Sequence, residues 1–250
     1  MKIAAKVQYL GLNYEGFQRQ KNHPSIQGEL ERALSSLLDK VMTIHGAGRT
    51  DSGVSALGQV ISFDCPRDIA DLEDFRFHLN MLLPNDISIV AMKVVDDGFD
   101  ARHSCMGKRY LYRFCIGEKH PLEYGTIAYL GKRFFDDKSF MDALKLFEGE
   151  HSFHNFTTKK EDVASFIRNV KPIQVELKDD TYEILFESNG FMTYQIRFMV
   201  GAALKAGFHK ISLDEIKQRL DDPSRHILPH KAPAEGLILL EVLYESDVFA

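Results

Sequence analysis

An arginine and an aspartate stand two positions apart in HGAGRTDSGVSA, residues 45–56, a segment with few other large side chains. In an extended backbone Arg49 and Asp51 point to the same side. A nearby cation lowers the pKa of an aspartate and keeps it ionised, as a carboxylate nucleophile requires. The flanking glycines would let a flipped-out nucleotide approach the backbone. The pattern indicates carboxylate catalysis, and an ordinary polar turn is the structural alternative.

Other chemistries fit this sequence less well. The loop has neither GxGxxG nor GK[ST], and its carboxylate would repel a phosphate. No second carboxylate stands at a spacing that suggests a two-acid glycosidase. The cysteines, Cys65, Cys105 and Cys115, have no CxxC spacing and are odd in number, which argues against a disulfide framework or a zinc site. His151 and His154 lack a third ligand. We therefore expect no metal site.

Composition sets the broad class. The chain has 250 residues, 44% hydrophobic and 27% charged, which suits one large or two small globular domains. It has no signal-like apolar segment and no apolar run of membrane-spanning length, so we expect a cytoplasmic protein without membrane partners. The net charge of −5 does not exclude a nucleic acid, because a local basic surface is what binds phosphate. Two local basic groups are present: Arg102, His103, Lys108, Arg109 and Arg113, then Arg197, Lys205, His209 and Lys210.

Hydrophobic periodicity in the first hundred residues predicts a β-α-β-α-β unit. Apolar residues alternate over 3–9 and recur at helical spacing over 25–38, where Ser25 is the expected N-cap. A strand is expected at 58–64, and a helix over 72–83 should end before a proline. A further strand over 86–95 completes the unit. This arrangement would place the glycine-rich segment between the first helix and the second strand.

A second alternation of strands and helices follows. We expect strands at 108–116, 170–177, 181–188 and 235–244, and helices at 137–147, 193–207 and 213–220. The strands over 170–177 and 181–188 should pair through a turn at Asp179-Asp180, and Gly201 should allow a close approach to its helix. The whole predicts two α/β units with a boundary near residues 98–106.

Six stretches, taken in order, resemble the tRNA pseudouridine synthase A family. GRTDSGVSALGQVISF is similar to the family's catalytic motif, GRTDxGVHA followed by a strand. The other stretches are YLGLNYEGFQRQ, SIQGELERALSSL, LNMLLPNDISIV with FDARHSCMGKRYLYRF, NGFMTYQIRFMVGAALKAG and APAEGLILLEVLY. The resemblance thus spans nearly the whole chain in the family's own order.

The resemblance implies a set of site residues. Asp51 falls on the catalytic aspartate and Arg49 on the arginine two places before it. Tyr110 falls on the tyrosine that lies against the target base, Arg197 on the helix arginine that pairs with the catalytic aspartate, and Leu237 on an apolar residue of the base pocket. Each of these three also has a purely structural alternative: Tyr110 could pack in the sheet, Arg197 could be a surface charge on its helix, and Leu237 could be an ordinary core residue. Four further basic residues are RNA-binding candidates: Arg19, Arg102, Lys108 and Lys205.

The resemblance also implies a fold and a reaction. The fold is the pseudouridine synthase fold, α/β (α+β), with two α/β subdomains that share a mixed, mainly antiparallel sheet and hold the active-site cleft between them. Residues 1–103 would carry the aspartate loop and residues 104–250 the second subdomain. The reaction is isomerisation of uridine to pseudouridine at positions 38, 39 and 40 of the tRNA anticodon stem-loop. The family acts as a homodimer on tRNA rather than DNA, without a cofactor.

Five positions depart from the family pattern. Leu10, Leu12, Phe17, Ser55 and Asp100 stand where the family has Asp, Thr, Trp, His and His. We expect these departures to affect substrate choice, because the first motif and the segment around position 100 are expected to face RNA.

Two other functions stay open at this point. One is an RNA-binding relative without activity, against which the retained aspartate argues. The other is a small-molecule enzyme, which would bind free nucleotides without RNA, whereas tRNA binding should weaken steeply with salt. The sequence leaves open whether the aspartate attacks C1′ of the ribose or C6 of the base.

Overall fold

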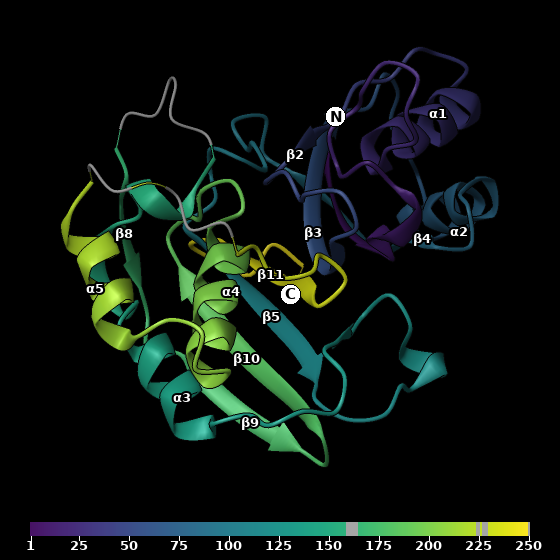
Figure 1. The fold of residues 1–250 in the computed structure, drawn as a ribbon. Coiled ribbons are helices and arrows are strands. Elements are labelled where there is room, and N and C mark those ends of the chain that lie inside the picture. Colours follow the sequence, from purple (N-terminus) through teal and green to yellow (C-terminus); the bar gives the residue numbers. More distant parts are fainter. Residues whose placement is uncertain (159–164, 224–225, 227–229, 250) are drawn as a thin grey trace. The chain divides into compact units, whose positions relative to one another are not determined.

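The computed structural model of the protein describes residues 1–158, 165–223, 226 and 230–249 (Figure 1). By their contacts these residues fall into two units, residues 1–108 with 238–250 and residues 109–237. The second unit is thus inserted into the chain of the first. Each unit combines strands with helices, so the mixed α/β class expected from the sequence is confirmed.

Three antiparallel strands form the centre of the first unit. They are β4 (Ile87–Val95), β1 (Lys2–Tyr9) and β3 (Ser55–Asp64), in that spatial order. The short β2 (His45–Gly46) pairs with β3, and β11 (Leu237–Leu243) adds to β3 in parallel, with Ile238 opposite Ser55. The predicted N-terminal strand is therefore a central strand, as its buried residues on both faces require.

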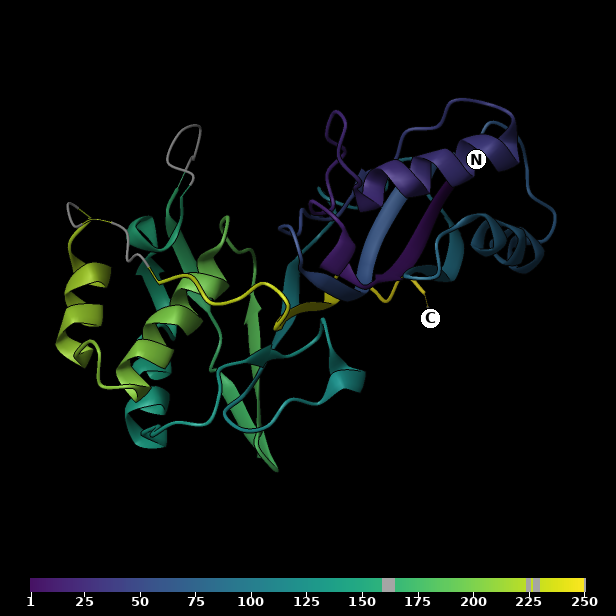
Figure 2. The same cartoon turned by 45° about the vertical axis from the view of Figure 1, so that its right-hand side comes forward.

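Two helices lie on one side of this sheet (Figures 1 and 2). Helix α1 (Ile26–Leu38) begins where the Ser25 side chain accepts a hydrogen bond from the Gly28 N–H, so the predicted N-cap is confirmed. Helix α2 (Leu72–Leu82) begins at Asp71, whose carboxylate accepts bonds from two N–H groups of the first turn. The inner face of α1 buries the residues that its 3.6-residue period predicts: Ile26, Leu30, Ala33 and Leu34.

The second unit contributes the remaining strands of the same mixed sheet. These strands are β5 (Gly107–Cys115), β6 (Ala128–Tyr129), β7 (Gly149–Ser152), β8 (Ile167–Val170), β9 (Gln174–Lys178) and β10 (Thr181–Ser188). The order is β5-β10-β8-β7, with β6 on β5 and β9 on β10. The predicted hairpin of β9 and β10 is confirmed, and its turn places Asp179 at φ 55°, a region that aspartate tolerates.

One strand predicted from the sequence is wrong, because the structure has two strands in its place. The expected strand over 170–177 is divided in the structure: β8 ends at Val170, and β9 begins at Gln174. Pro172 lies between them, and a proline has no N–H to donate to a sheet ladder. The alternation of apolar residues across the proline was therefore misleading.

Three helices cover one face of the strands of the second unit: α3 (Asp137–Lys145), α4 (Gln195–Gly207) and α5 (Leu213–Asp221) (Figure 1). In the core beneath them, Phe114 of β5 stacks on Tyr182 of β10 with ring centroids 4.5 Å apart. A Cβ added at Gly201 of α4 would lie 1.9 Å from the His230 carbonyl oxygen, so the predicted close approach is confirmed. Short 3-10 turns occur at Gly11–Asn13, Pro121–Glu123 and His154–Phe156.

Across the described ranges, every helix is too short or too polar to cross a lipid bilayer.

Candidate active site

The loop of residues 48–54, here called the aspartate loop, is hydrogen-bonded through its main chain to the segment that follows β1. The Phe17 N–H donates to the Thr50 carbonyl oxygen at 3.1 Å, and the Gly53 N–H donates to the Tyr14 carbonyl oxygen at 3.3 Å. These bonds join two stretches that lie far apart in sequence. They fix the backbone of the loop, whereas an isolated glycine-rich segment is conformationally free.

Side-chain hydrogen bonds also hold the aspartate loop against the end of β1 and the residues that follow it. The Tyr9 hydroxyl and the Thr50 hydroxyl are 2.8 Å apart, and both residues are buried. Burial raises the pKa of Tyr9 to about 12, so the phenol stays protonated at neutral pH. Just beyond the loop, the Gly11 N–H donates to the buried Ser55 hydroxyl at 3.0 Å. The loop is thus anchored at its centre and at the start of β3.

Two glycines allow this close packing. A Cβ added at Gly11 would lie 2.1 Å from the Val54 carbonyl oxygen. Gly16 has φ +92°, and a Cβ there would lie 2.7 Å from the Thr50 carbonyl oxygen. No side chain fits in either contact without moving the backbone of the aspartate loop. Tyr9, Gly11 and Gly16 are functional residues that the catalytic motif does not point to; the spacing of the two glycines in YLGLNYEGF is the sequence signal for them.

The aspartate loop presents its two charged residues differently. Arg49 is exposed, whereas Asp51 is partly buried. The Val54 N–H donates to the Asp51 carbonyl oxygen at 3.1 Å and closes the turn that follows the aspartate. The main chain of Asp51 is therefore fixed in a residue that is not fully buried, and a catalytic group needs such a fixed backbone.

Among the RNA-binding candidates, Lys108 lies next to the aspartate loop. Its side chain runs along Gly48, where an added Cβ would lie 2.8 Å from the lysine Cε. Its Nζ donates to the Cys105 sulfur at 3.3 Å. Gly48, three positions before Asp51, thus makes room for the Lys108 side chain beside the aspartate loop.

The other candidates lie elsewhere. Arg19 is exposed and pairs with the buried Glu31 at 2.8 Å, so its charge is partly committed to a structural ion pair. Arg102 is exposed in the turn that precedes β5, and Lys205 is half-buried in the last turn of α4.

Tyr110 lies on β5 in the second unit. It is buried and makes an edge-to-face contact with Phe191, with ring centroids 5.5 Å apart. Tyr112, two residues further along the same face, is fully buried and donates its hydroxyl to the Pro233 carbonyl oxygen at 3.0 Å. The predicted alternation on this strand is confirmed, and Tyr110 is a packed residue on a rigid strand.

Arg197 is a buried arginine rather than a surface charge of α4. Its side chain is 9% exposed, and its Nε donates to the Ala232 carbonyl oxygen at 2.8 Å. The Ala232 N–H donates back to the Arg197 carbonyl oxygen at 2.9 Å. The guanidinium also lies 5.5 Å from the Tyr194 ring centre. Burying an always-charged guanidinium is costly unless hydrogen bonds and other partners replace its lost hydration, and the Ala232 carbonyl and the Tyr194 ring are two such partners.

Leu237 is buried at the start of β11, where its N–H donates to the Ala234 carbonyl oxygen at 2.9 Å. The predicted site residues therefore divide by unit. Arg49, Asp51 and Lys108 belong to the first unit; Tyr110, Arg197 and Leu237 belong to the second.

Two of the departures from the family pattern lie in the protein interior. Phe17 is 2% exposed, and its ring lies against Gly46, where an added Cβ would be 2.4 Å from it. Ser55 is 4% exposed and holds Gly11 as described above. The expectation that the first motif as a whole faces RNA is therefore wrong for Phe17. The main chain of Phe17 bonds to Thr50 of the aspartate loop, and Ser55 bonds to Gly11 just beyond that loop.

Asp100 organises a turn. Its carboxylate accepts hydrogen bonds from the Arg102 N–H at 2.9 Å and the His103 N–H at 2.7 Å. Burial opposes its ionisation, but these two N–H groups, together with the charges of His103 and His45, hold the pKa of Asp100 below its ordinary value. The departure at position 100 therefore has a structural role in shaping the segment before β5.

Comparison with known proteins gives one likeness that extends over nearly the whole chain. Residues 5–104 and 143–245 match the model of a family described as tRNA pseudouridine synthase. The chain is 34% identical over 261 residues to tRNA pseudouridine synthase A of Streptococcus sanguinis, with 98% of this chain and 99% of that protein covered. It is 35% identical over 250 residues to the protein of the same name from Bacillus subtilis, with 98% and 100% covered.

Solved structures give a more distant likeness. A Cbf5-Nop10-Gar1 complex matches with a TM-score of 0.37 and 13% identity over 81% of this chain and 45% of the other. An archaeal box H/ACA sRNP Nop10-Cbf5 complex matches with a TM-score of 0.35 and 13% identity, over 81% and 44%.

Proposed function

The chain belongs to the tRNA pseudouridine synthase family, and on this premise we propose that Asp51 is the nucleophile with which it isomerises uridine in tRNA. The enzyme is an isomerase that modifies tRNA. What carries the assignment to Asp51 is the anchoring of the aspartate loop. Its backbone is fixed by residues 9–17, and Asp51 is only partly buried, two positions after the exposed Arg49.

The reaction needs a nucleophile but no external reactant. The bond between N1 of uracil and C1′ of ribose breaks, the base turns, and a new bond forms between C5 and C1′. The proton on C5 leaves and N1 gains one, so no redox change and no group donor are involved. A carboxylate splits this exchange into two easier steps by adding to C1′ or to C6 and leaving again. An ionised Asp51 can do either.

Residues of the second unit would serve the same reaction. Tyr110, held edge-on against Phe191, offers an aromatic face and a hydroxyl for the target base. Arg197 is buried and oriented by Ala232, which suits a cation that must hold a carboxylate ionised. Leu237, buried at the start of β11, would help line the base pocket.

We place the modified uridines at positions 38, 39 and 40 of the anticodon stem-loop. Paired RNA hides its base edges in a deep groove, so the protein would select its target by shape and by backbone contacts. We further propose a cytoplasmic homodimer in which each tRNA contacts both subunits. Sedimentation equilibrium would test this assembly against the chain mass of 28.5 kDa.

The activity and its position can be tested together. Uridine carrying tritium at C5 loses the label when pseudouridine forms. We expect the protein to release tritium from such a tRNA transcript and to leave free uridine unchanged. Release should stop when the uridines at 38, 39 and 40 are replaced by cytidine, with the opposing bases changed to keep the stem paired.

The outcomes separate the competing functions. Undiminished release from the cytidine transcript would place the target elsewhere in tRNA. No release from any transcript, with salt-sensitive tRNA binding retained, would identify an RNA-binding relative without activity. Conversion of free uridine would favour a small-molecule enzyme.

Lys108 should contribute one phosphate contact to tRNA binding. Each lysine that neutralises a phosphate steepens the fall of affinity with salt. We expect Lys108→Ala to weaken tRNA binding and to reduce the slope of log K against log salt by about one. Filter binding over a salt series measures this slope. Lys40→Ala, an exposed lysine after α1, is the matched control and should leave the slope unchanged. An unchanged slope in Lys108→Ala would remove Lys108 from the RNA-binding surface.

A further inference from the structure

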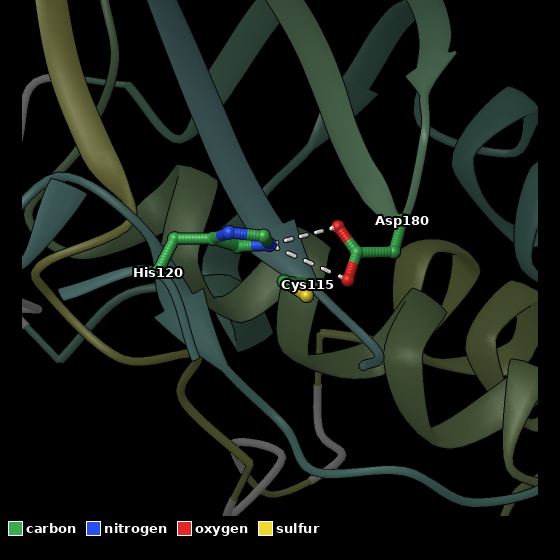
Figure 3. Close-up of side chains that lie close together, drawn as sticks. All are labelled: Cys115, His120 and Asp180. Carbon is green, nitrogen blue, oxygen red and sulfur yellow. Dashed lines mark hydrogen bonds and ion pairs between the residues drawn. The ribbon is translucent and has the colours of Figure 1, made fainter. Parts of the chain in front are cut away.

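A cysteine, a histidine and an aspartate lie together in the second unit, apart from the residues discussed above (Figure 3). Cys115 is the last residue of β5, His120 lies in the segment that follows, and Asp180 is in the turn between β9 and β10. One donor atom from each residue lies within 4.8 Å of the other two. Cys115 is buried, Asp180 is half-buried, and His120 is exposed. The group is thus reached from solvent on its histidine side.

The backbone is arranged to bring these side chains together. A Cβ added at Gly117 would lie 2.3 Å from Asp180 Oδ2, so glycine allows the carboxylate to approach the chain beyond β5. The Tyr129 hydroxyl accepts from the His120 N–H at 2.6 Å and lies 2.7 Å from the His120 carbonyl oxygen, to which it donates. Tyr129 in turn is paired with Cys115 in the β5–β6 ladder. His120 is therefore held beside Cys115 by a fixed neighbour.

An ordinary ion pair explains only part of this group. His120 Nε2 lies 3.2 Å from one Asp180 oxygen and 3.5 Å from the other. The thiol of Cys115, which the ion pair does not include, is buried beside the Asp180 carboxylate and can donate to it or to the Glu118 carbonyl oxygen at 3.5 Å. A nucleophilic cysteine needs an electropositive setting, and this one is electronegative. A cation between the three groups would satisfy all of them.

The donor set indicates which cation. Thiolate, imidazole and carboxylate together suit Zn²⁺, whereas Mg²⁺ and Ca²⁺ prefer oxygen ligands alone. Zinc bond lengths place tetrahedral ligand atoms about 3.3–3.8 Å apart. The donor atoms of Cys115, His120 and Asp180 need only small side-chain movements to reach that spacing.

We propose that Cys115, His120 and Asp180 bind one Zn²⁺, with water as the fourth ligand. The ion would fasten the segment after β5 to the turn between β9 and β10, as a structural clamp within the second unit. Binding replaces the thiol proton: the S–H bond breaks, the S–Zn bond forms, and one proton passes to solvent.

Cobalt offers a direct test, because Co²⁺ takes zinc sites and absorbs light when a thiolate binds it. The tag-free chain, treated with a chelator and then dialysed, is titrated with Co²⁺. We expect a thiolate-to-cobalt band in the near ultraviolet that saturates at one ion per chain. Added Zn²⁺ should abolish the band by displacement, and Zn²⁺ should raise the melting temperature of the chelator-treated protein.

The variants identify the ligands. Cys115→Ser should lose the band, whereas Cys105→Ser, a half-buried cysteine of the first unit, should keep it. His120→Gln should weaken cobalt binding and lose the zinc-dependent rise in melting temperature. Because His120 is exposed, this variant should fold even if Cys115→Ser does not. His78→Gln, another exposed histidine paired with an aspartate, is its control.

Failure to bind Co²⁺ would overturn the proposal and leave His120 and Asp180 as an ion pair beside a buried thiol. A band that persists in folded Cys115→Ser, or equal binding by His120→Gln and the parent, would also overturn it. The readouts are spectroscopic and thermal, so they do not depend on synthase activity.

Discussion

Replacing Asp51 with asparagine should abolish tritium release from tRNA while leaving tRNA binding nearly unchanged. The amide has the shape of the carboxylate but neither its charge nor its nucleophilicity, so neither C1′ nor C6 can be attacked. Loss of a covalent nucleophile lowers kcat by about 10⁴–10⁶-fold. The expected result is release at background level under single-turnover conditions, with the dissociation constant for tRNA changed by only a few-fold.

The matched control is Asp64→Asn, an exposed aspartate at the end of β3 in the same unit. It should retain the full rate, which shows that loss of a charge by itself is harmless. Asp51→Asn with a rate within tenfold of the parent would exclude Asp51 as the nucleophile. Loss of tRNA binding together with activity would instead indicate that Asp51 serves to hold the loop.

Gly16→Ala should produce the largest effect of any change that leaves all the charged groups in place. Gly16 has φ +92°, and the new Cβ would lie 2.7 Å from the Thr50 carbonyl oxygen and 3.2 Å from the Asp51 carbonyl carbon. Strain in this region of φ costs about 1–3 kcal/mol for a residue other than glycine. The contact is with main chain, so relief requires movement of the aspartate loop. Displacement of a catalytic group by about 1 Å can lower the rate about 10²-fold.

Single-turnover rates and thermal melting measure both consequences of Gly16→Ala. The expected pattern is a loss in kcat that exceeds the loss in tRNA affinity, in a protein that still folds. Gly98→Ala is the control, because an added Cβ at Gly98 meets nothing within 4 Å. A Gly16→Ala protein with normal kcat would show that the loop does not depend on this support.

Local patterns predicted most elements of the fold. The alternation in β1 and the helical spacing in α1 report directly which side of an element is buried, and burial drives both. The N-cap at Ser25 and the glycine at 201 were likewise readable, because caps and close approaches demand particular residue types. The division between β8 and β9 was missed where alternation ran across Pro172.

The candidate site was predictable only in part. The family motif identified Asp51 and Arg49, but the support of their loop by Tyr9, Gly11 and Gly16 depends on contacts between segments some 40 residues apart. Such contacts leave no local period in a sequence. For the same reason the interior positions of Phe17 and Ser55 could not be distinguished from surface positions in a polar motif.

By itself the sequence determined the class of fold, the element that carries each site residue and the family motif around the aspartate, since these depend on neighbours along the chain. The tertiary structure decided what distant segments do together. In the tertiary structure β11 pairs in parallel with β3 of the first unit, and Arg197 is buried with its Nε bonded to Ala232. Cys115, His120 and Asp180 lie together although they come from separate segments of the chain. The physical reason is that hydrophobic periodicity records whether a residue is buried, whereas only packing and sheet pairing determine which residues it is buried against.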